Sequence, residues 1–137
     1  MKKTLRLTSV ALVLMMLLTL TSCVPSDSSK AEEKMEKKDY KVVVVTGTAA
    51  ELAGKALGVE GLSETMVATK TAKDEDGKDT IEIVSAYWFE ETSQAKEAFE
   101  KIEKAAKEDS ESTDNFVCKR SGKVIYAGTK QAVKDFN

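Results

Sequence analysis

The sequence predicts an α+β domain in which an antiparallel or mixed sheet carries its helices on one face. Segments that alternate between apolar and polar residues occur in pairs, joined by turns at Asp76-Gly77 and Ser121-Gly122, as in β-hairpins. Segments with helical spacing of apolar residues separate these pairs. The resulting order, β-α-β-β-α-β-β-α, is roughly ferredoxin-like, although the additional hairpin and the last helix leave the strand order open.

The predicted domain opens with a strand and a helix. Residues Tyr40–Val45 include a run of valines and are apolar on both faces, which favours a central strand. A helix is expected from Thr48, because Thr48 and Glu51 have the spacing of a capping box, to about Leu57, where Gly58 ends it. Its apolar side consists of Leu52, Ala53, Ala56 and Leu57.

A hairpin follows, with strands at Met66–Thr69 and Ile81–Phe89 on either side of the turn at Asp76 and Gly77. Period-two alternation divides the second of these strands between the two faces of the sheet. One face carries Ile81, Ile83, Tyr87 and Phe89, and the other carries Val84, Ala86 and Trp88.

The longest helix is predicted after a cap at Thr92 or Ser93. Charged residues occupy its outer side, where Glu97 and Lys101 form a favourable pair one turn apart. A polar loop over Glu108–Asn115 comes next. The apolar residues of the helix recur at intervals of three and four, at Ala95, Ala98, Phe99, Ile102, Ala105 and Ala106.

A second hairpin, Phe116–Arg120 and Lys123–Ala127, and a short helix complete the predicted domain. With Ser121 and Gly122 as the turn, the strand pairs are Cys118 with Ile125, Phe116 with Ala127, Val117 with Tyr126, and Lys119 with Val124. The last helix, Lys130–Phe136, follows a cap at Thr129 and buries Ala132, Val133 and Phe136.

The N-terminal segment has the layout of a secretory signal peptide. A tip with Lys2, Lys3 and Arg6 precedes an apolar run that ends in Leu20-Thr21-Ser22-Cys23. This ending resembles the lipobox of bacterial lipoproteins. The resemblance implies cleavage between Ser22 and Cys23, followed by a diacylglycerol thioether on Cys23, with palmitate among the acyl chains. Two alternatives are an uncleaved anchor and ordinary secretion with a free thiol at Cys23.

The resemblance covers only the first 23 residues and implies the location, while composition and the predicted elements define the parts that follow. Residues 1–22 are the signal peptide, 23–39 are the lipidated cysteine and a flexible charged tether, and 40–137 are a single small domain. A short helix within the tether would not change its role. The protein is expected at the cell membrane, facing outside the cytoplasm, or at an outer membrane if the organism has one.

Composition narrows the classes of function. The chain has 21 Lys and Arg against 23 Asp and Glu, and loss of three basic residues with the signal leaves a net charge of −5. Such an acidic domain disfavours binding to nucleic acid. Histidine is absent from the sequence, which removes the usual general base and the commonest metal ligand. No metal or other cofactor is expected, and Cys118 is predicted to be a buried structural thiol.

Three sequence motifs lack essential parts of the sites that they suggest. The turn at Gly47 lacks the later glycines of a dinucleotide fingerprint, and Gly54-Lys55 lacks the remainder of a P-loop. The acidic run Asp74–Asp79 contains Lys78 and lacks the spacing of an EF-hand. A capped helix start and a solvated hairpin tip are therefore expected, with anion binding at the helix start as an alternative.

An apolar stripe is the predicted interaction face. It lies on the side of the sheet away from the predicted helices, where it would mark a binding site if exposed. The alternative is that another strand, the tether or the last helix covers it. The stripe consists of Val84, Ala86, Trp88, Val117, Val124 and Tyr126.

These observations favour a non-catalytic, membrane-anchored binding module. Its partner would be an envelope protein or a second copy of the chain. The second hypothesis is a carrier or sensor of a small ligand, with a pocket between the sheet and the helices. The third is an enzyme that uses lysine, carboxylate or Cys118 chemistry without histidine.

Overall fold

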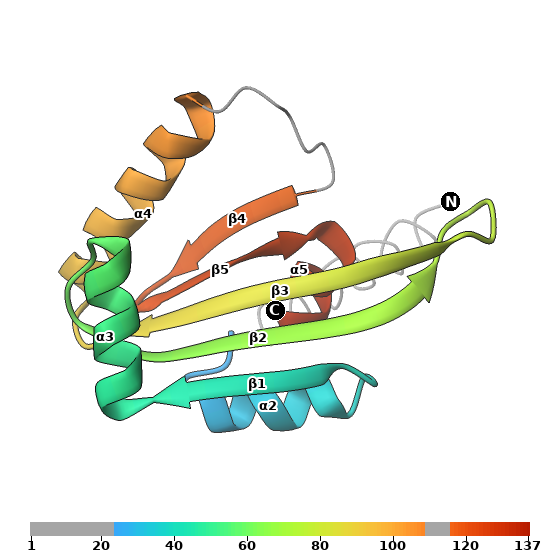
Figure 1. Cartoon of the computed structure of the whole chain (residues 1–137), viewed down its shortest axis with the longest axis horizontal. Coiled ribbons are helices and arrows are strands. Elements are labelled where there is room, and N and C mark those ends of the chain that lie inside the picture. Colours follow the sequence, from blue (N-terminus) through green and yellow to red (C-terminus); the bar gives the residue numbers. More distant parts are fainter. Residues whose placement is uncertain (1–23, 109–115) are drawn as a thin grey trace, which may run out of the picture.

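The computed structural model describes residues 24–108 and 116–137, and confirms the predicted α+β class (Figure 1). The predicted signal peptide, Ser22 and Cys23 lie outside the described residues. Within the described ranges there are five strands and four helices. They are α2 (Ser28–Glu36), β1 (Lys41–Thr46), α3 (Gly47–Leu57), β2 (Leu62–Lys73), β3 (Asp79–Phe89), α4 (Thr92–Glu108), β4 (Phe116–Ser121), β5 (Val124–Thr129) and α5 (Lys130–Phe136).

All neighbouring strands of the sheet are antiparallel, in the order β1-β2-β3-β5-β4. The ferredoxin-like arrangement is not confirmed. The prediction that the valine-rich strand is central is wrong, because β1 forms one edge of the sheet. Its two apolar faces have different environments: Val42 and Val44 pack against the core, whereas the Val43 side chain is 66% exposed.

Helices cover both faces of the sheet, so the prediction of helices on one face is wrong. Helices α2 and α5 pack on one face around a core that includes Met66, Val84 and Trp88. Helices α3 and α4 cross one end of the other face, where Leu62, Phe89 and Ile125 are buried (Figure 1). We call these the α2/α5 side and the α3/α4 side. Successive side chains along each strand point alternately to these two sides.

The segment predicted as a flexible tether contains helix α2, which belongs to the core. The Asp27 carboxylate caps it by accepting a hydrogen bond from the Lys30 amide at 2.8 Å. Ala31 and Met35, four residues apart, are fully buried against the sheet. Only these small and flexible apolar residues mark the buried side of an otherwise charged helix, so composition alone indicated a solvated segment.

Helix α5 forms as predicted and closes the α2/α5 side. The Phe136 ring lies 6.2 Å from the Trp88 ring and 5.1 Å from the Tyr126 ring, between centroids. The Lys34 ammonium of α2 donates hydrogen bonds to the carbonyl oxygens of Phe136 and Asn137, at 3.0 and 2.8 Å. The first and last described helices therefore hold each other in place.

The two predicted hairpins are present, but one differs in register. In the second, the turn is Gly122 and Lys123, with Gly122 at φ 57°. Cys118 therefore pairs with Ala127 instead of Ile125. Moving a turn by one residue moves the strand pairing by two, so each side chain keeps its predicted face. The remaining corrected pairs are Phe116 with Thr129, Val117 with Gly128, and Lys119 with Tyr126.

Helix α3 packs through its small residues. Ala50 and Gly54 are buried, and a Cβ at Gly54 would lie 3.0 Å from the Leu62 Cβ. The predicted apolar side of this helix is consequently turned outward, and Leu52 and Leu57 are exposed. The predicted stop at Gly58 is confirmed by its left-handed backbone. The expected capping box is absent, since the helix begins at Gly47 and its N-cap, at Thr46, makes no side-chain hydrogen bond.

Candidate binding face

The predicted interaction stripe is buried on the α2/α5 side. Trp88 is 3% exposed and Tyr126 is 4% exposed, and the Trp88 indole Nε1 donates a hydrogen bond to the Pro25 carbonyl at 3.0 Å. The stripe is therefore not a free face, and the alternative holds: helix α2, in the segment predicted as the tether, and the last helix, α5, cover it. Val84, Ala86 and Val124 are also buried, and Val117 packs against the same core while remaining partly exposed.

The exposed large apolar side chains gather on the opposite, α3/α4 side. Directly paired residues of antiparallel strands point to the same side of a sheet, so the register assigns Val43 and Val67 to one side. Continued pairing and alternation add Ile81 and Phe116, and the remaining residues lie on α3 and α4. Seven large apolar residues are exposed in the described part of the chain, and all belong to this side. They are Val43, Leu52, Leu57, Val67, Ile81, Ile102 and Phe116.

A groove of about 360 Å³ lies between α3, α4 and the sheet. Strands β3, β5 and β4 supply its floor, through the side chains of Tyr87, Phe89, Ile125, Ala127 and Cys118. Leu57 borders it at the end of α3, and Ile102 borders it on α4. The groove is predominantly apolar and opens to solvent. We call the groove together with Val43, Val67, Ile81 and Phe116 the binding face.

The packing of α4 explains why the groove exists. Ala95 and Ala98 are buried, which brings the first half of the helix close to the sheet. The second half diverges from the sheet, as Figure 1 shows. Ile102 therefore remains 37% exposed, although its spacing predicts a core position.

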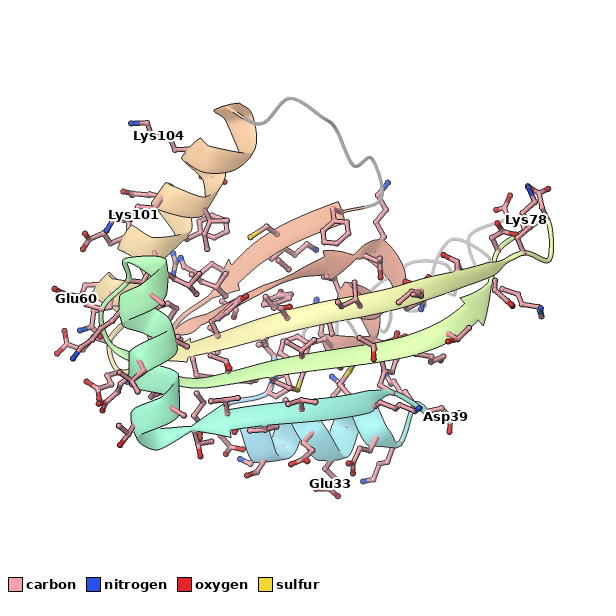
Figure 2. All side chains as sticks on the ribbon, viewed as in Figure 1. Glu33, Asp39, Glu60, Lys78, Lys101 and Lys104 are labelled. Atoms are coloured by element: carbon pink, nitrogen blue, oxygen red, sulfur yellow. The ribbon has the colours of Figure 1, made fainter. Side chains whose placement is uncertain are left out.

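Lys101 of α4 is the charged residue among those that line the groove. The Lys101 ammonium lies 3.5 Å from the Glu97 carboxylate and donates a hydrogen bond to the Gly58 carbonyl at 3.3 Å. Figure 2 shows Lys101 and Lys104 projecting outward from α4. The contacts of Lys101 join the C-terminal end of α3 to α4 and define one rim.

Cys118 is the thiol on the groove floor. Burial raises its pKa, and the negative charge of Glu103 raises it further. The thiol is therefore protonated near neutral pH, and a protonated thiol is a poor nucleophile. This supports the predicted structural role of Cys118 over a catalytic one.

A wider hollow lies on the side of the domain where β2, β3 and α5 meet, with a volume of about 880 Å³. Two of its polar groups make contacts within the domain: the Tyr40 hydroxyl donates to Asp135 at 2.8 Å, and the Lys70 ammonium lies 5.0 Å from the centre of the Tyr40 ring. Burial, followed by the Asp135 contact, raises the Tyr40 pKa. These contacts attach β1 and β2 to α5, so we treat the hollow as structural.

The acidic hairpin tip has the predicted form of a solvated turn. The Asp74 carboxylate accepts hydrogen bonds from the backbone amides of Asp76 and Lys78, both at 2.9 Å, and Lys73 pairs with Asp79. The described residues contain no group of three or more Cys, Asp or Glu side chains placed to hold a metal ion. They also contain no helix that is long and apolar enough to span a membrane.

Comparisons with known proteins provide no relative. No protein-family model matches the chain, and no curated protein or solved structure matches it.

Proposed function

We propose that this chain is a membrane-anchored lipoprotein that faces outside the cytoplasm and acts as a non-catalytic binding module. The lipobox-like ending at Ser22 and Cys23 supports the anchor and the location. The binding face on the α3/α4 side supports the binding role. It replaces the predicted stripe around Trp88.

The observation that carries the proposal is the distribution of exposed apolar side chains. The α2/α5 side of the sheet is covered by helices, whereas the α3/α4 side leaves Val43, Ile81 and Phe116 at least half exposed. Contiguous exposed apolar surface on a small domain commonly marks an interaction site. Val43 and Val67 are paired across β1 and β2, and only Ser85 separates them from Ala127 on the floor of the apolar groove. A partner could exclude water from such a surface.

A protein partner fits this surface better than a small ligand does. Exposed apolar side chains also lie outside the groove, at Val43 on β1, Val67 on β2 and Ile81 on β3. A small ligand in the groove would leave Val43 and Val67 in water. We therefore infer an envelope protein with an apolar patch as the partner, or a second copy of this chain.

The small-ligand carrier is the second candidate. The groove, at about 360 Å³, falls in the lower part of the range typical of ligand pockets, about 300–1,000 Å³. This hypothesis requires a pocket between the sheet and the helices, and the groove lies in such a place. Trp88 would be a poor fluorescent reporter for it, since the indole lies on the α2/α5 side, away from the groove.

Photocrosslinking in the native envelope tests the proposal. A benzoylphenylalanine residue replaces Val67 on the binding face or, as a control, the exposed Gln131 on α5. We expect a protein adduct of defined mass with Val67→benzoylphenylalanine that is lost when Phe116→Glu and Ile81→Glu are added. Adducts of equal yield at both positions, or none at Val67, would contradict the proposed face.

Light scattering by residues 24–137 separates the two kinds of partner. A dimer that becomes monomeric on Val67→Glu substitution would identify a second copy of the chain. A stable monomer would exclude a second copy as the partner, so that an envelope protein remains the proposed partner. A small molecule found by native mass spectrometry, and displaced by Ala127→Trp on the groove floor, would favour the carrier instead.

A further inference from the structure

The described chain begins on the α2/α5 side of the sheet, opposite the binding face. Val24 packs against the core of that side. Pro25 is buried, and its carbonyl oxygen accepts the hydrogen bond from the Trp88 indole. Trp88 alternates with Tyr87 along β3, so its side chain points away from the groove.

No free tether separates this starting point from the domain. The Ser28 amide donates a hydrogen bond to the Glu64 carboxylate at 2.9 Å, and Ser28 is 1% exposed. The chain is therefore held to the sheet from Val24 through the first turn of α2. Cys23 is the preceding residue, and one residue spans at most about 3.6 Å of extended chain.

We propose that the α2/α5 side rests on the lipid surface and that the binding face points away from the membrane. This rests on the proposed lipidation of Cys23. Acyl chains attached to Cys23 must enter the bilayer, which holds Val24, and with it the α2/α5 side, at the headgroups. The apolar binding face is then presented to partners on the aqueous side.

The chemistry of the α2/α5 side agrees with contact to headgroups. Its outward-facing residues are polar: the exposed lysines are Lys30, Lys37, Lys130 and Lys134, and Glu33 and Glu36 are exposed beside them, with Lys37 paired to Glu33 at 3.0 Å. Lysines near a bilayer surface are attracted to anionic lipids. The same side exposes no large apolar residue among those described, so it would lie on the headgroups without insertion.

Spin-label relaxation on the full, lipidated protein tests this orientation. Cys118→Ser removes the native thiol, and a single label is placed at Lys134→Cys on α5 or at Val43→Cys on the binding face. The protein is reconstituted into phosphatidylcholine vesicles with a nickel-chelating lipid, whose headgroup accelerates relaxation of nearby labels. We expect several-fold greater acceleration at position 134 than at position 43.

A linker variant provides the control. Insertion of about ten glycine and serine residues between Cys23 and Val24 restores a flexible tether, and the difference between the two labels should then disappear. Equal acceleration at both positions without the linker, or greater acceleration at position 43, would overturn the orientation. Circular dichroism checks that each variant is folded.

Mass spectrometry separates a failed orientation from a failed anchor. A purified protein whose mass includes diacylglycerol, yet whose two labels relax alike, overturns the orientation and leaves the anchor in place. A protein without the lipid mass, in which Cys23 also takes up the spin label, overturns both. Neither outcome affects the photocrosslinking test of the binding face at Val67.

Discussion

The Trp88 indole donates its hydrogen bond to the Pro25 carbonyl across 63 positions of sequence, and this bond is buried. It joins the end of β3 to the first described residues of the chain. Because the indole also packs against Phe136, Trp88 connects the two segments that cover the α2/α5 side.

Trp88→Phe should lower the free energy of unfolding by about 1–3 kcal/mol, because it leaves the buried Pro25 carbonyl without its donor. Urea unfolding followed by circular dichroism measures the change. Phe116→Leu, at an exposed position, is the control and should change stability by less than about 0.5 kcal/mol. An unchanged midpoint for Trp88→Phe would contradict the assigned role of the bond.

The contrast between α5 and α3 gives a second prediction. Phe136→Ala should cost about 3–5 kcal/mol of stability, since the ring is fully buried. Leu52→Ala should cost less than about 1 kcal/mol, because the side chain is 61% exposed. Chemical denaturation of both variants measures this difference. A comparable loss for the two would mean that the apolar side of α3 faces inward.

Gly128 should tolerate no side chain. It pairs with Val84, and a Cβ at Gly128 would lie 2.7 Å from the Val84 Cα and closer still to the Ile83 carbonyl oxygen. Gly128→Ala should therefore destabilise the domain by about 3 kcal/mol or more. Gly47→Ala is the matched control. A Cβ at Gly47 has no atom within 4 Å, so the substitution should cost only the free energy of a positive φ, about 1–2 kcal/mol. Thermal melts that rank the two in the opposite order would disprove this packing.

Stability should fall at alkaline pH because of Tyr40. Its pKa is raised in the folded state by burial and by the Asp135 contact, so the phenol is deprotonated earlier in the unfolded chain, near pH 10. Its contribution is complete below that pH and is lost as pH rises further. Unfolding free energies between pH 8 and about 11 should decline less steeply for Tyr40→Phe than for the native chain. Parallel declines would contradict the role of Tyr40.

Cys118 should react slowly with thiol reagents while the domain is folded. Its pKa is raised by burial and by Glu103, which lowers the fraction of reactive thiolate at neutral pH. Reaction with an aromatic disulfide at pH 7 should accelerate markedly in urea. Glu103→Gln should increase the rate in the folded protein at mildly alkaline pH. A folded-state rate equal to that in urea would show an accessible, unperturbed thiol.

Local patterns predicted the hairpins and helices well. The turn chemistry at Asp76 and Gly77, the alternation along β3 and the apolar spacing of α5 depend on neighbouring residues, so the sequence contains their signal. The register of the second hairpin depended on which two residues form the turn. There the glycine at position 122 begins the turn instead of ending it.

The choice of the open face could not be predicted in the same way. Alternation separates Trp88 from Tyr87, but it does not tell which side the helices cover. That choice depends on α2 and α3, whose buried contacts are made by Ala31, Ala50 and Gly54. Such small residues give weak hydrophobic patterns. The larger Leu52 and Leu57 dominated the pattern of α3, so the wrong side of this helix was predicted to be buried. The groove itself depends on the divergence of α4, a tertiary property.

The contact between Lys34 and the carbonyl oxygens of Phe136 and Asn137 spans more than a hundred positions, with separations of 102 and 103. During synthesis, α2 is made long before its partner α5. The α2/α5 side of the sheet therefore stays partly uncovered until α5 has been made, and only then can the two helices close it. A chain truncated before α5 would expose Trp88 to water, because its ring packs against Phe136.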